Sequence, residues 1–205
     1  MHLPLSFDLT DRKVVLIGGG KAALEKFVQL AKTPCELKII TPRFNDDFNA
    51  ALEKKTTAKL HIELRKFNDG DIDGAFMVFS AIDDADTAER IFQLCRARGI
   101  LINSADDRAR CDFYTNAVIE RGPIQVAVSS GGRFAGLSAV LRRHLEALIP
   151  AELDQEWEKI FALRERALAL QSVSEKKSVI TNIVRELEQK YFARRSDTKT
   201  PEKNT

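Results

Sequence analysis

Residues 14–26 read VVLIGGGKAALEK, and this stretch decides the fold. An apolar run that ends in glycine is typical of a β-strand buried on both faces. The segment after the glycines has a helical spacing of apolar residues. This helix face is expected to hold Leu24, Phe27, Val28 and Ala31. A strand, a glycine turn and a helix form either a nucleotide-binding loop or a plain turn between two elements.

The spacing within the loop favours a dinucleotide. Gly18, Gly20 and Ala23 fit the pattern G-x-G-x-x-A, in which the first glycine makes the tight turn and the second admits a pyrophosphate. The third small residue lets the helix pack closely on the sheet, and the helix N-terminus favours the anion. A Walker A loop is excluded, because Lys21 is not followed by Ser or Thr. The role of Lys21 itself stays open.

Strands and helices alternate through the first half of the chain. Further buried or half-exposed strands are predicted at 35–41, 59–65, 74–82 and 100–105. Helices are predicted at 43–55 and 83–98; the latter could be capped by Asp83 or Asp84 and end at Gly99. This alternation predicts an α/β fold with a doubly wound parallel sheet.

The pattern changes beyond this region. Residues 113–132 read as two strands joined by the turn signal ERGP. An amphipathic helix follows, with a row of apolar residues along one side. The row consists of Leu137, Val140, Leu141, Leu145 and Leu148. Two more helical patterns cover 152–170 and 174–193, and the polar last residues are predicted to be disordered.

Composition sets limits on the function. The net charge of +2 gives no strong field toward nucleic acid or a membrane, and we expect neither as a partner. No apolar run reaches the roughly 18 residues of a membrane span. The three cysteines have no CxxC spacing, and the histidines are scattered, so we expect no zinc or other metal site. A reducing cytoplasm is the expected location.

Polar residues at the ends of the predicted strands are candidates for chemistry. No Asp or Glu ends the second strand to bind a ribose 2′-hydroxyl, and Arg43 could meet a 2′-phosphate or face solvent. This leaves NAD and NADP open. Asp106 and Asp107 follow the last strand of the sheet and act either as a proton acceptor or as helix caps. The SSGG segment at 129–132 precedes a helix and either binds an anion or forms a loop.

These segments in this order resemble one family. They run from the glycine loop through AFMVFSAIDD, INSADDRARCDF, AVIERGPIQVAVSSGG and VLRRHLEALIP. The chain is similar to the precorrin-2 dehydrogenase and sirohydrochlorin ferrochelatase family, of the siroheme-synthase N-terminal, NAD-binding type. The resemblance is close over about residues 3–150. It implies a Rossmann domain at 1–112, a dimerisation element at 113–149, a helical module at 150–193 and a tail at 194–205.

The resemblance also implies roles for single residues. Asp106 would be the catalytic residue. The cofactor-binding residues would be Gly18, Gly19, Gly20, Lys21, Ala22, Pro42, Arg43, Ile82 and Asn103. The substrate-binding residues would be Ser129, Ser130, Gly131 and Arg133. The chain departs from the family pattern at Ile82, where Thr is usual, and at Asn116 and Ala135-Gly136.

The activity that the resemblance implies is the NAD-dependent oxidation of precorrin-2 to sirohydrochlorin in siroheme biosynthesis. Ferrochelation of sirohydrochlorin, with Fe²⁺ as a substrate, is a further activity of some relatives. The implied assembly is a homodimer. Two alternatives stay open: a non-catalytic module that binds NAD or a tetrapyrrole, and an enzyme for a related tetrapyrrole of the cobalt route.

Overall fold

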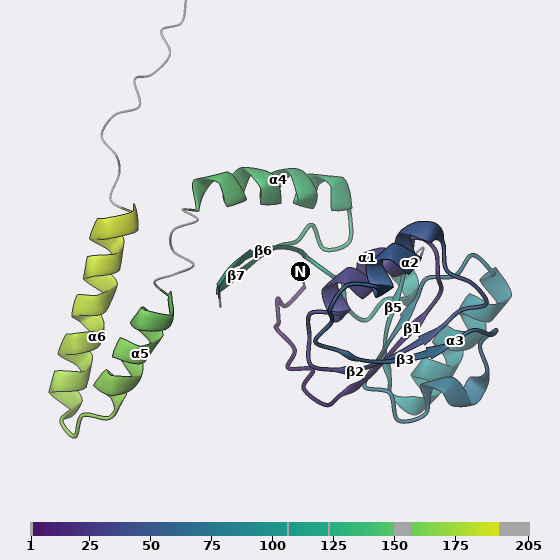
Figure 1. The fold of residues 1–205 in the computed structure, drawn as a ribbon, viewed down its shortest axis with the longest axis horizontal. Helices are drawn as coiled ribbons and strands as arrows, with labels where there is room; N and C mark the ends of the chain where they lie inside the picture. Colours follow the sequence, from purple (N-terminus) through teal and green to yellow (C-terminus); the bar gives the residue numbers. More distant parts are fainter. Residues whose placement is uncertain (1, 106, 123, 150–156, 193–205) are drawn as a thin grey trace, which may run out of the picture. The chain divides into compact units, whose positions relative to one another are not determined.

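The computed structural model of this chain describes residues 2–105, 107–122, 124–149 and 157–192. The chain forms two compact units, Met1–Thr115 and Asn116–Thr205 (Figure 1). The candidate Asp106 and the predicted tail at 194–205 lie outside the described residues.

A parallel five-stranded sheet forms the centre of the first unit. Its strands are β1 (Lys13–Ile17), β2 (Glu36–Ile40), β3 (Lys59–Glu63), β4 (Met77–Ser80) and β5 (Leu101–Ser104). Their order is β3-β2-β1-β4-β5, so β1 lies in the middle between β2 and β4. Ile17, the last residue of β1, is level with Ile40 and Ser80.

Helices cover both faces of this sheet. They are α1 (Lys21–Leu30), α2 (Asp46–Leu52) and α3 (Ala85–Arg98), with short 3-10 turns at Asp69–Ile72 and Arg108–Arg110. Phe27 and Phe48 pack with Val14 and Leu16 on the side of α1 and α2. Ile91 and Cys95 of α3 pack with Val15 and Ile17 on the other side. The predicted doubly wound α/β fold is therefore confirmed (Figure 1).

The buried face of α1 differs from the expected one. Ala23, Phe27 and Leu30 are its buried residues, whereas the side chain of Val28 is 48% exposed. Ala23 lies directly against the glycine loop, since a Cβ on Gly18 would stand 3.4 Å from the Ala23 Cβ. The face of α1 that contacts the glycine loop and the sheet is therefore the one with Ala23, Phe27 and Leu30, and Val28 lies on the exposed side.

The second unit begins with the predicted hairpin. β6 (Ala117–Arg121) pairs antiparallel with β7 (Ile124–Val128), and α4 (Ala135–Leu148) contacts both strands. The Arg121 guanidinium donates to the Glu146 carbonyl at 3.3 Å and so ties β6 to α4. α5 (Trp157–Leu168) and α6 (Val173–Leu187) contact each other, and a π-helical turn at Glu188–Phe192 follows.

Candidate functional site

The glycine loop lies where the winding of the sheet reverses. β1 is flanked by β2 on one side and by β4 on the other. In doubly wound folds, the loops after two such strands diverge and nucleotides bind between them. Gly18 to Gly20 follow β1, and Ala81 and Ile82 follow β4. Four of the predicted cofactor residues therefore lie at the expected edge of the sheet.

Two of the glycines are required by packing. Gly18 has φ +129°, and a Cβ on it would stand 2.1 Å from the carbonyl oxygen of Ala81. A Cβ on Gly19 would stand 2.2 Å from the carbonyl oxygen of Arg43. The Asn45 amide also donates to the Gly19 carbonyl at 3.0 Å. The glycine loop thus packs closely against the backbone of the segments that follow β2 and β4.

Gly20 has no such packing reason. A Cβ on it would meet nothing within 4 Å. Its φ of −89° and ψ of −167° are extended values that other residues adopt freely. The space beside Gly20 is therefore open, as a site needs where a ligand must approach the backbone.

The N-terminus of α1 supplies free hydrogen-bond donors to this space. Gly20 has no side chain to cap the helix, and the first turn holds no acidic residue. Among the described residues, the first α1 amide with an acceptor is that of Leu24, which donates to the Gly20 carbonyl at 3.0 Å. By contrast, Asp84 caps α3 by accepting from the Thr87 amide. A dinucleotide pyrophosphate fits the uncapped end of α1, because free amides and the helix dipole favour an anion.

Lys21 and Ala22 begin α1, with Lys21 exposed and Ala22 half-buried. Their amides belong to the uncapped turn. Among the described residues, no contact assigns a role to the Lys21 side chain, and its contribution to cofactor binding remains a prediction.

The loop after β2 presents two further predicted residues. Pro42 and Arg43 are both exposed. The buried Thr41 fixes this loop, because its hydroxyl donates to the Arg43 carbonyl at 2.7 Å and accepts from the Arg43 amide at 3.3 Å. Thr41 was not among the sequence candidates. A hydroxyl at the end of a buried strand, directly before proline, is the signal that would have found it.

The end of β4 contributes Ile82 and a buried hydroxyl. Ile82 is half-buried and packs against the core on the α3 side. Ser80 is 3% exposed, and its Oγ has no hydrogen-bond partner among the described residues. Buried polar atoms are normally paired. An unpaired hydroxyl at the ligand edge of the sheet is consistent with a site that a bound group completes.

Asn103 at the end of β5 is turned toward the protein. It is 5% exposed, and its Nδ2 donates to the Phe113 carbonyl at 2.8 Å. The Cys111 thiol donates to the Ser104 carbonyl at 3.1 Å, and burial raises the pKa of this thiol. Both side chains hold the segment after β5 against the sheet. The predicted place of Asn103 beside a nicotinamide stays a prediction.

The two consecutive aspartates have separate outcomes. Asp106 lies outside the described residues. Asp107 caps the turn at Arg108–Arg110, since its carboxylate accepts from the Ala109 amide at 2.8 Å, and it pairs with Arg110 at 3.3 Å. For Asp107, the alternative of a capping residue is therefore the one that the structure supports.

Lys26 is a residue that sequence reasoning missed. It lies on α1 one turn after Ala22, and its Nζ donates to the Thr115 hydroxyl at 2.6 Å. Burial lowers the pKa of its ammonium group, against the opposing influence of Glu25 and Cys111. A lone lysine beside the buried residues Ala23 and Phe27 of a helix is the signal that could have found it.

The predicted substrate residues lie in the second unit. Ser129 Oγ accepts from the Gly131 amide at 3.1 Å, and Ser130 Oγ accepts from the Phe134 amide at 3.0 Å. Arg133 is exposed and forms no ion pair with any described residue. These contacts shape a tight turn before α4.

The helix that follows this turn is also uncapped. Phe134 at the N-cap position of α4 makes no side-chain hydrogen bond, and the first turn has no acidic residue. Gly136, one of the departures from the family pattern, lies under Phe134, because a Cβ on it would stand 2.9 Å from the Phe134 ring. The turn and the helix end could therefore receive an anionic group.

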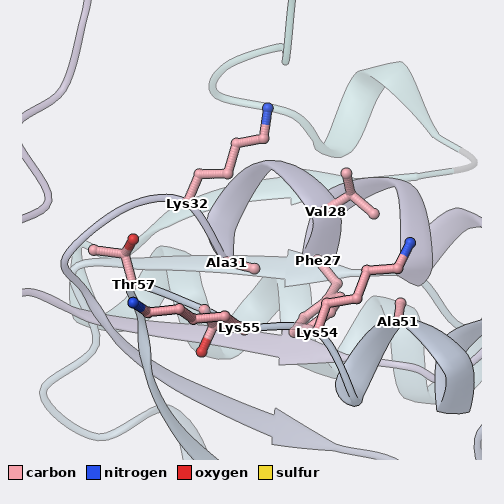
Figure 2. A pocket seen from close by; sticks show the side chains of 9 residues that line it. Phe27, Val28, Ala31, Lys32, Ala51, Lys54, Lys55 and Thr57 are labelled. Atoms are coloured by element: carbon pink, nitrogen blue, oxygen red, sulfur yellow. The ribbon is translucent and has the colours of Figure 1, made fainter.

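A separate hollow lies between the ends of α1 and α2 (Figure 2). Its volume is about 250 Å³, and Phe27, Val28, Ala31 and Ala51 form its apolar part. Lys32, Lys54 and Lys55 stand around it. These residues come from the last turns of the two helices and from the segments that directly follow them, whereas the glycine loop precedes the first turn of α1. The hollow is therefore distinct from the candidate cofactor site.

Two kinds of feature are absent from the described residues. In the ranges that the structure covers, no group of three His, Cys, Asp or Glu side chains could hold a metal ion. Within the same ranges, no helix has the length and apolar character to cross a membrane.

Comparison with known proteins agrees with the resemblance. The siroheme synthase of Mannheimia succiniciproducens is 38% identical over 152 residues, which are 74% of this chain and 31% of that protein. Siroheme synthase 1 of Pectobacterium atrosepticum is 32% identical over 165 residues, or 80% of this chain and 34% of that protein. The chain thus spans about a third of the length of these relatives.

A solved structure supports the fold. The structure titled SirC, precorrin-2 dehydrogenase, matches with a TM-score of 0.71 at 19% identity and covers 91% of both chains. A family model described as putative NAD(P)-binding matches residues 5–117, which include the whole parallel sheet and the glycine loop. The chain therefore belongs to this putative NAD(P)-binding family.

Proposed function

We propose that this chain oxidises precorrin-2 to sirohydrochlorin with NAD⁺ in siroheme biosynthesis. One observation carries the proposal: the open space at Gly20, beside the uncapped end of α1, lies at the reversal point of the sheet. The substrate is inferred from the resemblance described above, from the similarity to siroheme synthases and from the matching structure, which is named a precorrin-2 dehydrogenase.

The reaction removes a hydride and a proton from precorrin-2. NAD⁺, when bound, accepts the hydride. Gly18 to Ala22 would hold its pyrophosphate, Pro42 and Arg43 its adenosine end, and Ile82 and Asn103 its nicotinamide end. Since Gly18 and Gly19 are wedged against neighbouring backbone, the loop is rigid and can hold the cofactor in one position.

Asp106 is the proposed acceptor of the proton. A carboxylate that follows a strand of the parallel sheet can act as a general base where its pKa suits the step. The proton that leaves precorrin-2 would pass to this carboxylate and then to solvent. Asp107 is not proposed for this role, because its carboxylate is engaged by the Ala109 amide and Arg110.

The substrate carries many carboxylates and needs a basic, donor-rich surface. Ser129, Ser130, Gly131 and Arg133 are proposed to provide it. Arg133 has no carboxylate partner among the described residues, and the α4 N-terminus that follows is uncapped. A substrate carboxylate would therefore find a free guanidinium and free amides.

We further propose that the protein is a homodimer. Leu137, Val140, Leu141, Leu145 and Leu148 of α4 are 36% to 65% exposed. Soluble proteins rarely leave such a continuous apolar row uncovered. A second copy would cover it. The test is the molar mass in solution of the wild type and of Leu141→Glu: a monomeric wild type would contradict the proposal.

Iron insertion into sirohydrochlorin is a second proposed reaction. Ferrochelation rests on the resemblance, with Fe²⁺ as the substrate of a second reaction. It is tested by the rate of siroheme formation from sirohydrochlorin and Fe²⁺ against the rate without protein.

A cytoplasmic location is also proposed. It fits the three free cysteines, because an oxidising compartment favours disulfide bonds.

The central experiment supplies precorrin-2 and NAD⁺ to the purified protein and follows NADH and sirohydrochlorin together. Equal amounts of both products, at a rate proportional to protein, are expected. If no NADH forms at high protein concentration, the dehydrogenase proposal fails. NAD⁺ or sirohydrochlorin binding without turnover would then support the non-catalytic module, and turnover of a cobalt-route tetrapyrrole would support the other alternative.

A further inference from the structure

The loop after β2 determines which dinucleotide a Rossmann fold selects. The ribose of the adenosine half lies outside the end of this strand. A carboxylate there accepts from the 2′-hydroxyl of NAD and repels the 2′-phosphate of NADP, whereas an arginine pairs with that phosphate. The side chains at this corner therefore report the cofactor.

The corner holds Arg43 in a fixed loop. Thr41 Oγ1 contacts both the amide and the carbonyl of Arg43, at 3.3 and 2.7 Å. The backbone of Asn45 donates to the Gly19 carbonyl at 3.0 Å, and the Asn45 side chain accepts from the Phe48 amide at 2.8 Å. The loop that carries Arg43 is thus hydrogen-bonded to the glycine loop. Arg43 itself is exposed to solvent.

The guanidinium of Arg43 has no carboxylate partner in the part of the chain that the structure describes. No ion pair or side-chain hydrogen bond joins it to any residue that the structure describes. Asp46 and Asp47, the first acidic residues after β2, lie beyond Asn45 in the first turn of α2. Arg43 is therefore available to an anion.

The carboxylate nearest in register is already engaged. Glu63 ends β3 and is level with Ile40, the last residue of β2. It pairs with Lys38 at 2.8 Å and with Arg65, and these cations lower the pKa of its carboxyl group. Neither β2 nor β3 therefore offers a free carboxylate to a ribose 2′-hydroxyl, and Arg43 is the charged residue that lies directly in the loop after β2.

We propose that this site binds NADP at least as tightly as NAD, with Arg43 pairing with the 2′-phosphate. The inference rests on the proposed function, because it concerns the cofactor of that reaction. The contact is a charge-assisted hydrogen bond on an exposed side chain, so it weakens as salt rises. Affinity for NADP should accordingly depend on salt more steeply than affinity for NAD.

The test is direct binding of NAD⁺ and NADP⁺ to the full chain by titration calorimetry, at low and high salt and without substrate. Arg43→Ala is expected to weaken NADP⁺ binding about tenfold, the size of one hydrogen bond to a charged group. It should weaken NAD⁺ binding by a clearly smaller factor, since NAD⁺ has no 2′-phosphate with which the guanidinium can pair. Arg43→Glu should prefer NAD⁺.

Lys54→Ala is the matched control. It removes the same charge from an exposed residue of the same unit, but from the hollow between α1 and α2 (Figure 2). If it weakens NADP⁺ binding as much as Arg43→Ala does, the effect is one of net charge and the inference fails.

The outcomes separate this inference from the proposed function. A wild type that binds NAD⁺ about tenfold more tightly than NADP⁺ contradicts the inference and leaves the dehydrogenase proposal intact. In another outcome, the wild type binds both dinucleotides, and Arg43→Ala binds NADP⁺ more weakly, while neither protein oxidises precorrin-2. This result supports the inference and contradicts the proposed function. Binding of neither dinucleotide overturns both.

Discussion

The ammonium group of Lys26 donates to the hydroxyl of Thr115 at 2.6 Å, which joins α1 to the last residue of the first unit. Phe113, two residues earlier, packs edge-on against Phe79 of β4 at 5.3 Å between ring centroids. The segment after β5 is therefore held from both α1 and the sheet. This segment follows the position of Asp106, so its anchoring bears on the candidate base.

The Lys26–Thr115 contact can be measured with a double-mutant cycle. Lys26→Met and Thr115→Val should each lower the free energy of unfolding, because each leaves one polar group without its partner. Together they should lower it by about 1 kcal/mol less than the sum of the single changes. Urea unfolding of the four proteins gives the coupling. Strict additivity would mean that the contact contributes nothing to stability.

Gly18 and Gly20 provide a paired test of the glycine loop. Gly18→Ala should lower stability by about 2 kcal/mol or more, because of its φ of +129° and the Ala81 carbonyl 2.1 Å from a Cβ. Gly20→Ala should leave stability within about 0.5 kcal/mol, since its Cβ meets nothing within 4 Å. It should nevertheless weaken NAD⁺ binding, because the methyl group fills the space proposed for the pyrophosphate. The measurements are thermal unfolding and calorimetry, and unchanged NAD⁺ affinity in Gly20→Ala would contradict the site.

The fold could be predicted from local signals. Four of the five strands, β1, β2, β4 and β5, are apolar runs with a glycine or proline at one end or both, and such runs have few other structures open to them. The sequence predicts an N-cap at Asp83 or Asp84 and a helix end at Gly99, and the structure shows Asp84 as the N-cap of α3 and Gly99 at its C-cap with φ +64°. Each of these features depends on residues that are close together in the chain. The local sequence is therefore sufficient to predict them.

The side chains that complete the site could not be predicted in this way. Lys26 contacts Thr115, which lies 89 residues further along the chain, whereas periodicity alone predicted a buried face of α1 that includes the exposed Val28. Thr41 clamps the backbone of Arg43 through a turn whose geometry a residue pattern does not specify. Contacts between distant elements depend on packing, which a sequence pattern does not contain.

Asp71 should be the most costly carboxylate to remove from the first unit. It is 4% exposed, receives two hydrogen bonds from Arg65 at 2.6 and 2.7 Å, and pairs with Lys38 at 2.8 Å. Asp71→Asn is expected to lower the free energy of unfolding by about 2 kcal/mol, because Lys38 and Arg65 lose a buried charged partner and keep only the more exposed Glu63. Asp73→Asn, at an exposed carboxylate paired with Arg98, should change it by less than about 0.5 kcal/mol. Equal losses in both variants would contradict the importance of the buried group.

The same carboxylate predicts a dependence of stability on pH. The Arg65 guanidinium holds the pKa of Asp71 well below its usual range. The unfolded chain therefore binds the proton more tightly, and the contribution of Asp71 is complete above about pH 4 and declines as pH falls toward the folded pKa. Urea unfolding of wild type and Asp71→Asn between about pH 5 and 2.5 should show a smaller decline in the variant. Parallel curves would assign the acid sensitivity to other carboxylates.

Substitutions of Asp106 and of its neighbour Asp107 test which of the two carboxylates is catalytic and which one caps a turn. Asp106→Asn should reduce precorrin-2 oxidation at least about a hundredfold, because an amide cannot accept the proton, while NAD⁺ affinity stays unchanged. Asp107→Asn should keep most of the activity and lower stability by about 1 kcal/mol, because the Ala109 amide and Arg110 lose a charged partner. The pH profile adds a readout that a structural role would not alter: the acidic limb of kcat/KM should disappear in Asp106→Asn and persist in Asp107→Asn. Full turnover in Asp106→Asn would require another base, and the engaged state of Asp107 argues against that residue taking over.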